Sequence, residues 1–135
     1  MTPTRVLIVD DNPMFIEMAT VALSAAGCVV AASAGASQAL VQIAALPPDL
    51  ILMDVQMPDM DGIELTRRLK ADPATKHIVI VAFTAYALKG DAPSLQAAGF
   101  DGYIGKPLEV ATLAAEVRFW LEAPASARAS HFVWP

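Results

Sequence analysis

Cysteine is nearly absent from this chain of 135 residues, in which Cys28 is the only one. A single cysteine excludes an internal disulfide and a metal site built from several cysteines, and the apolar neighbours of Cys28 predict a buried structural thiol. Basic residues are also few, nine against fourteen acidic ones, for a formal net charge of -5. Because nucleic-acid-binding proteins usually present a basic face to phosphates, this balance argues against direct DNA binding.

Long apolar runs are missing as well. No run approaches the roughly 18 residues that a membrane-spanning helix needs, and the first residues have no signal-peptide pattern. We therefore expect a cytoplasmic protein without membrane association. An apolar fraction of 56% with 17% charged residues excludes a disordered chain, and the length fits one domain.

Patterns typical of strands and of helices alternate five times along the chain. Apolar, β-branched runs predict strands near residues 5–10, 28–32, 50–54, 78–83 and 100–104. Helical spacing predicts helices near residues 13–26, 35–45, 62–72, 85–98 and 108–122. Asp11 and Asn12 both qualify as the cap of the first helix, and Gly90 and Pro93 interrupt the fourth. Short loops between these elements predict an α/β fold with a parallel sheet.

The predicted domain takes up residues 1–123, and residues 124–135 read as a flexible tail. Within the tail, residues 131–135 are unusually apolar for a free end. An incidental extension or a tail folded onto the surface is one interpretation, and a short peptide that docks on a partner is the other.

Polar residues follow the predicted strands at their carboxyl ends. Asp10 and Asp11 follow the first strand, and Asp54 ends the third, fully apolar one. Thr84 and Lys106 follow the fourth and fifth strands. Carboxyl ends of parallel strands meet at one edge, where open α/β sheets keep their ligand sites, so these side chains should converge. Three neighbouring carboxylates are tolerable with a cation among them, and hard oxygen ligands suit Mg²⁺. Lysine and threonine donate hydrogen bonds to a phosphoryl group. Asp54 lies between the metal ligands and these donors, so it is a candidate nucleophile.

With these residues, the chain resembles the CheY-like receiver domains of two-component response regulators. The resemblance covers residues 5–122 and rests on four short motifs in the family's order and spacing: Asp10-Asp11, Asp54 in Leu-Met-Asp-Val-Gln-Met-Pro-Asp-Met-Asp-Gly, Phe83-Thr84-Ala85, and Lys106-Pro107. Residues 83–91 are similar to DivK-like single-domain regulators and to the receivers of hybrid kinases. The resemblance implies a five-stranded parallel sheet in the order 2-1-3-4-5, flanked by five helices.

The resemblance also implies a phosphoacceptor. Asp54 would take a phosphoryl group from a histidine kinase or a histidine phosphotransfer protein. Mg²⁺ would be held by Asp11, Asp54 and the backbone carbonyl of Gln56, with Asp10 acting mainly through a water on the metal. The chain would be a signalling protein that catalyses phosphoryl transfer only to and from its own Asp54, and not otherwise an enzyme.

Further residues carry implied roles in binding and switching. Thr84 and Lys106 would bind the phosphoryl oxygens. Tyr103 matches the switch aromatic, which would change the face formed by helix 4, strand 5 and helix 5, where a downstream protein binds. Gln56 and Tyr86 match positions that modulate the lifetime of the phosphorylated state. We expect a monomer or weak dimer that acts by partner binding or phosphate relay.

Three other functions compete with this hypothesis. A phosphatase with an aspartyl nucleophile would have an Asp two residues after Asp54, where Gln56 stands. A nucleotide or flavin binder would have a glycine-rich loop after the first strand, where Asp10 and its neighbours stand. A pseudo-receiver, which binds partners without phosphorylation, is disfavoured by the complete set of Asp, Thr and Lys. Met1 lies close to the first strand and favours a free-standing protein, but a piece of a hybrid kinase stays open.

Overall fold

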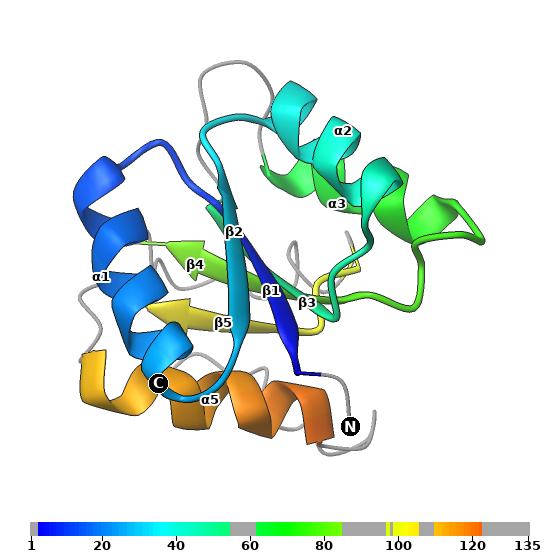
Figure 1. The fold of residues 1–135 in the computed structure, drawn as a ribbon. Helices are drawn as coiled ribbons and strands as arrows, with labels where there is room; N and C mark the ends of the chain where they lie inside the picture. The colour runs from blue at the N-terminus through cyan, green and yellow to red at the C-terminus, as the bar shows by residue number, and fades with distance from the viewer. Residues whose placement is uncertain (1–2, 55–61, 85–96, 98, 106–109, 123–135) are drawn as a thin grey trace.

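The computed structural model describes residues 3–54, 62–84, 97, 99–105 and 110–122 (Figure 1). The strands are β1 (Arg5–Val9), β2 (Val29–Ser33), β3 (Leu50–Asp54), β4 (Val79–Thr84) and β5 (Gly102–Gly105). They form one parallel sheet in the order β2-β1-β3-β4-β5. The described helices are α1 (Pro13–Ala25), α2 (Ala36–Ala45), α3 (Gly62–Ala71) and α5 (Val110–Glu122). The predicted sheet is confirmed, and the predicted fourth helix lies outside the described residues except for residue 97.

Two apolar layers cover the sheet. Alternate strand residues point to opposite faces, so Leu7 and Ile51 join the layer under α2 and α3, whereas Ile8 and Leu52 join the layer under α1 and α5. Figure 1 shows the two helix pairs on opposite sides of the sheet. Because both faces are covered, the central strand β3 is buried along its whole length. Burial on two sides explains why its sequence is apolar without alternation.

Helix α1 begins and ends at recognisable caps. The Asn12 side chain accepts hydrogen bonds from the backbone N–H groups of Met14 and Phe15, at 3.0 and 3.3 Å, which makes Asn12 the amino-terminal cap. At the other end, Gly27 has a positive φ of 93°, and the N–H of Cys28 donates to the carbonyl of Leu23 at 3.0 Å. Because this bond commits Cys28 to the helix cap, β2 begins one residue later than predicted.

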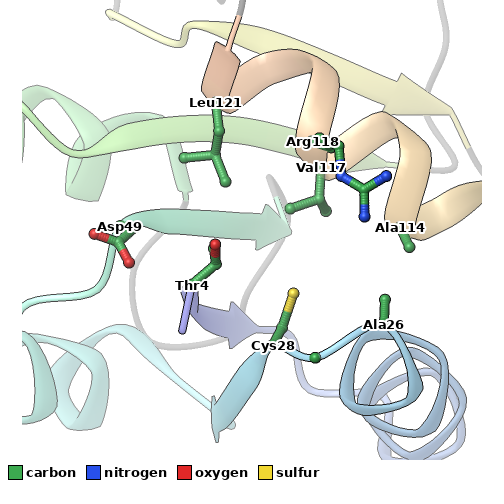
Figure 2. A pocket seen from close by; sticks show the side chains of 9 residues that line it. Thr4, Ala26, Cys28, Asp49, Ala114, Val117, Arg118 and Leu121 are labelled. Atoms are coloured by element: carbon green, nitrogen blue, oxygen red, sulfur yellow. The ribbon is translucent and has the colours of Figure 1, made fainter. Parts of the chain in front are cut away.

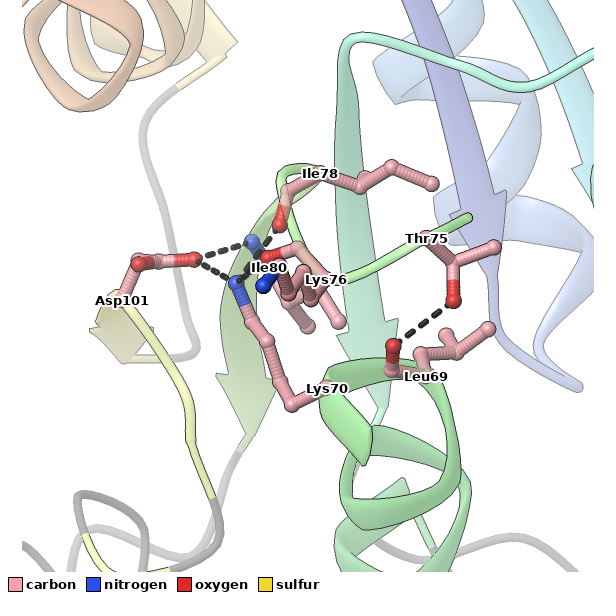
Figure 3. Close-up of polar contacts among 7 residues, drawn as sticks. All are labelled: Leu69, Lys70, Thr75, Lys76, Ile78, Ile80 and Asp101. Carbon is pink, nitrogen blue, oxygen red and sulfur yellow. Dashed lines mark hydrogen bonds and ion pairs between the residues drawn. The ribbon is translucent and has the colours of Figure 1, made fainter. Parts of the chain in front are cut away.

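A polar network holds α3 against the amino ends of β4 and β5 (Figure 3). The Lys70 ammonium donates to the carbonyls of Lys76 and Ile78, at 3.2 and 2.7 Å, and to the Asp101 carboxylate at 2.8 Å. The same carboxylate oxygen accepts the N–H of Ile80 at 2.8 Å. The Lys70 and Asp101 side chains are 19% and 21% exposed, so these charge-assisted bonds are partly shielded from water.

The network determines how the chain enters β5. Gly99 has a φ of +106°, and a Cβ atom there would lie 2.8 Å from Cγ of Lys70. Only glycine combines this backbone conformation with so close an approach. Phe100 is buried in the layer under α2 and α3, and β5 begins at Gly102, two residues later than predicted. Asp101 is instead joined to β4 through both its backbone N–H and its side chain.

Candidate functional site

Two acidic residues lie side by side at the carboxyl edge of the sheet. The register pairs Val9 of β1 with Met53 of β3, so the next residues, Asp10 and Asp54, are neighbours on adjacent strands. Adjacent strands are about 4.8 Å apart. The alternation along both strands assigns the two residues to the face covered by α1 and α5, together with Ile8 and Leu52. The strand pairing thus brings together carboxylates that are 44 positions apart in the sequence.

Asp11 completes a cluster of three carboxylates. One oxygen from each of Asp10, Asp11 and Asp54 lies within 4.8 Å of the others. Asp10 is 1% exposed and Asp54 is 8% exposed, whereas Asp11 lies in solvent. The cluster therefore combines two buried carboxylates with one that is exposed.

The backbone around Asp10 orients its carboxylate. The N–H of Asn12 donates to Oδ1 of Asp10 at 2.9 Å, and the N–H of Asp10 donates to the carbonyl of Ser33 at 3.0 Å. The amino terminus of α1 follows directly, and its partial positive charge favours anions nearby. Asn12 thus serves both as the helix cap and as a donor to the acidic cluster. Sequence reasoning found only the first of these roles, because the second depends on the path of the loop.

The cluster has the chemistry of a site for a hard cation. Its described ligands are carboxylate oxygens, two of them buried, and such groups repel each other unless a positive charge lies among them. A half-open arrangement of few carboxylates leaves room for water and phosphate oxygens around a small divalent ion. The donor set therefore fits a divalent cation.

The other predicted site residues are described in part. Phe83 pairs with Asp54 across the ladder, so the backbone of Thr84 ends β4 at the same edge of the sheet. Tyr103 lies in β5, with its backbone paired to Ala82. The backbone of Thr84 pairs with that of Gly105 in β5. The remaining predicted positions lie outside the described residues: Gln56, Tyr86 and Lys106. The roles of all these residues stay predictions.

The prediction that Cys28 is a buried thiol is wrong, because this residue lies at the amino edge of the sheet. Cys28 is only half-buried and lines a cavity of about 370 Å³ between α1, β1 and α5, instead of lying in the core (Figure 2). Burial raises the pKa of the Cys28 thiol above its ordinary value, and the Arg118 guanidinium partly offsets this rise. Sequence reasoning missed the cavity because its walls come from distant segments.

The fold and the acidic edge define a doubly wound α/β protein with a candidate cation site at the carboxyl edge of its sheet. The response regulator receiver domain family matches residues 6–118. The chain is 34% identical over 119 residues to the polar-differentiation response regulator DivK of Brucella anthropi, and the match covers 88% of this chain and 97% of that protein. The chain belongs to the response regulator receiver domain family.

Solved structures agree with this assignment. A putative response regulator from Chloroflexus aurantiacus is 34% identical, with a TM-score of 0.84 over 90% of this chain and 100% of that one. The chemotaxis response regulator CheY4 of Vibrio cholerae is 28% identical, with a TM-score of 0.83 over 88% and 99% of the two chains. Within the described residues, no helix is long and apolar enough to cross a membrane.

Proposed function

We propose that this receiver domain is a phosphoacceptor of a two-component or phosphorelay system, phosphorylated on Asp54. The observation that carries the proposal is the cluster itself. Asp54 ends the buried central strand, is 8% exposed, and lies within 4.8 Å of two further carboxylates. A strand-end carboxylate in this environment can act as a nucleophile if the charge of the transferred group is neutralised.

The phosphodonor is a phosphohistidine on a histidine kinase or a histidine phosphotransfer protein. An oxygen of the Asp54 carboxylate forms a bond to phosphorus while the bond between phosphorus and the imidazole nitrogen breaks. The imidazole nitrogen leaves with the electron pair of that bond, and it takes up a proton from water when the other ring nitrogen carries none. In hydrolysis, water attacks phosphorus, the bond to the Asp54 oxygen breaks, and inorganic phosphate is released. Both steps depend on positioning and charge stabilisation more than on covalent chemistry by the protein.

Asp11, Asp54 and the backbone carbonyl of Gln56 would hold Mg²⁺, and Asp10 would contribute mainly through water. Bound Mg²⁺ supplies neutralisation of the charge on the transferred phosphoryl group. The carboxylates supply ligands whose positions are fixed by the fold. The N–H of Asn12 keeps one oxygen of Asp10 occupied and so restricts the rotation of that side chain.

Thr84 and Lys106 would bind the phosphoryl oxygens, since a hydroxyl and an ammonium at the same sheet edge are donors to that group. Tyr103 would respond to the movement of Thr84, with the surface of helix 4, β5 and α5 as the site for a downstream protein. Gln56 and Tyr86 would modulate the lifetime of the phosphorylated state. The output is therefore partner binding or onward phosphate transfer.

Phosphate incorporation from acetyl phosphate, measured by intact mass with and without Mg²⁺, tests the proposal. We expect a metal-dependent adduct on the parent protein and none on Asp54→Asn. Asp49→Asn is the matched control, because Asp49 lies directly before β3, at the opposite end of the strand from Asp54, and outside the cluster. An adduct that survives in Asp54→Asn would show that Asp54 is not the nucleophile.

If the parent protein forms no adduct, the chain would instead act as a phosphorylation-independent interaction module. The cytoplasmic location, the monomeric or weakly dimeric state, and the division into a domain of residues 1–123 and a tail of residues 124–135 stay predictions within this proposal.

A further inference from the structure

A cavity of about 370 Å³ opens at the amino edge of the sheet, at the opposite end from the acidic cluster. One wall consists of Val117, Arg118 and Leu121 of α5, and Thr4 and Cys28 face them from across the space (Figure 2). The volume is at the lower end of the range of roughly 300–1,000 Å³ that is usual for ligand sites. Such a space accommodates one large side chain more readily than a cofactor.

The α5 side of the cavity suits an aromatic group, whereas Thr4 and Asp49 make the opposite side polar. Val117 is buried, Leu121 and Cys28 are half-buried, and all three belong to the apolar layer under α1 and α5 or pack against it. Arg118 is exposed at the edge of the cavity, and no ion pair engages it among the residues that the structure describes. A guanidinium beside an apolar surface stacks well on the face of an aromatic ring.

The chain itself carries a candidate for this space. Leu121 lines the cavity, α5 ends at the next residue, and residues 123–135 lie outside the described part. The first eight of these residues are Ala, Pro, Ser and one Arg, and Phe132, Val133 and Trp134 come after them. This apolar group is the feature of the tail that the phosphoacceptor function does not explain.

The connecting stretch is long enough for the return. Residues 123–130 would span about 16 Å on average as a flexible chain, and about 27 Å at full extension. The cavity lies beside the last turn of α5, within that distance. A short tether also provides an effective concentration of about the millimolar level, so even a weak apolar contact is populated within one chain.

We propose that residues 131–135 bind in this cavity of their own chain, with an aromatic ring of the segment between Arg118 and the apolar wall of Val117 and Leu121. The bound segment covers the thiol of Cys28. It also joins the carboxyl-terminal turn of α5 to the end of α1. The segment therefore acts as a strap that holds α5, and it does so independently of the phosphorylation of Asp54.

The single cysteine makes the proposal directly testable, because every thiol reaction reports on Cys28. The first experiment measures the rate of reaction with Ellman's reagent on the folded, full-length chain. Phe132→Ser combined with Trp134→Ser should raise the rate by about fivefold or more, since the covered thiol reacts only from the minor open state. The matched control, Ala127→Ser combined with Ala129→Ser, alters the tail equally without touching its aromatic residues and should leave the rate unchanged.

A second experiment identifies which chain supplies the segment. Val133→Cys should form an intramolecular disulfide with Cys28 under mild oxidation, and adding the two aromatic substitutions should reduce its yield severalfold. The yield with and without the aromatic substitutions separates docking of the segment from random collisions of a tethered tail. Covalent dimers in place of the intramolecular disulfide would place the segment of a second copy in the cavity and overturn the proposal. An unchanged Cys28 rate in the aromatic double variant would overturn it too.

Discussion

Removing one charge from the acidic cluster should make the protein more stable when no divalent cation is present. Asp10, Asp11 and Asp54 each contribute an oxygen within 4.8 Å of the others, and two of these side chains are buried. The folded state therefore holds like charges together that are far apart in the unfolded chain. Asp54→Asn keeps the shape of the side chain and removes its charge, so it relieves the repulsion without opening a cavity.

The geometry sets the size of this effect. Two unit charges 4.8 Å apart repel by about 3.5 kcal/mol at an effective dielectric constant of 20 and by about 0.9 kcal/mol in bulk water. Because Asp10 and Asp54 are 1% and 8% exposed, their repulsion is closer to the first figure. Asparagine loses hydrogen bonds to the charged carboxylate, each worth about 1.5–3 kcal/mol. We expect the free energy of unfolding to rise by about 1–2 kcal/mol as the balance of these effects.

Urea unfolding at low ionic strength, followed by circular dichroism with a chelator present, measures the difference. Adding Mg²⁺ should then reverse the order of the two proteins. A cation at a hundred times its dissociation constant stabilises the folded state by about 2.7 kcal/mol, and only the parent has the complete ligand set. Asp49→Asn serves as the control, because its unfolding should respond to Mg²⁺ as the parent's does.

Two results would refute this reasoning. If Asp54→Asn were less stable than the parent in chelator, the three carboxylates would not repel one another strongly enough to destabilise the folded state. If Mg²⁺ stabilised both proteins equally, Asp54 would not belong to the cation site, whatever its distance from Asp10.

Three further predictions concern the scaffold and the thiol. Lys70→Met should lower the free energy of unfolding by about 2–4 kcal/mol, because it leaves a partly buried carboxylate without its cation; a loss in urea melts comparable to that of an exposed lysine would contradict the network. Gly99→Ala should cost about 1–3 kcal/mol, from the positive φ and the contact with Lys70, and an unchanged melting temperature would argue against this geometry. Burial raises the pKa of the Cys28 thiol, and only the thiolate reacts, so the alkylation rate with iodoacetamide should reach its midpoint at a higher pH than for a free cysteine. Arg118→Leu should raise this midpoint further, whereas a lower midpoint would mean that the guanidinium does not face the thiol.

Local patterns in the sequence predicted the sheet and the place of the acidic residues. A run without alternation from Leu50 to Met53 is typical of a strand covered on both faces, and the structure buries it completely. Asp10 and Asp54 each follow such a run, so the carboxyl edge of a parallel sheet was the expected meeting point. Hydrophobic periodicity is a property of neighbouring residues, and it is readable before the chain folds.

Other features depend on residues that are distant in the sequence. The ion pair of Lys70 and Asp101 joins positions 31 apart, and nothing near either residue marks it. Cys28 has apolar neighbours and was expected in the core, but the cap of α1 holds it at the edge of a cavity. The parallel sheet therefore followed from local patterns, its strand order followed from the family resemblance, and the convergence of Asp10, Asp11 and Asp54 followed from their places after the strands. The depth of the acidic cluster, the bonds that fix β5, and the space beside Cys28 were decided by tertiary packing, because they depend on distances between segments that no local pattern records.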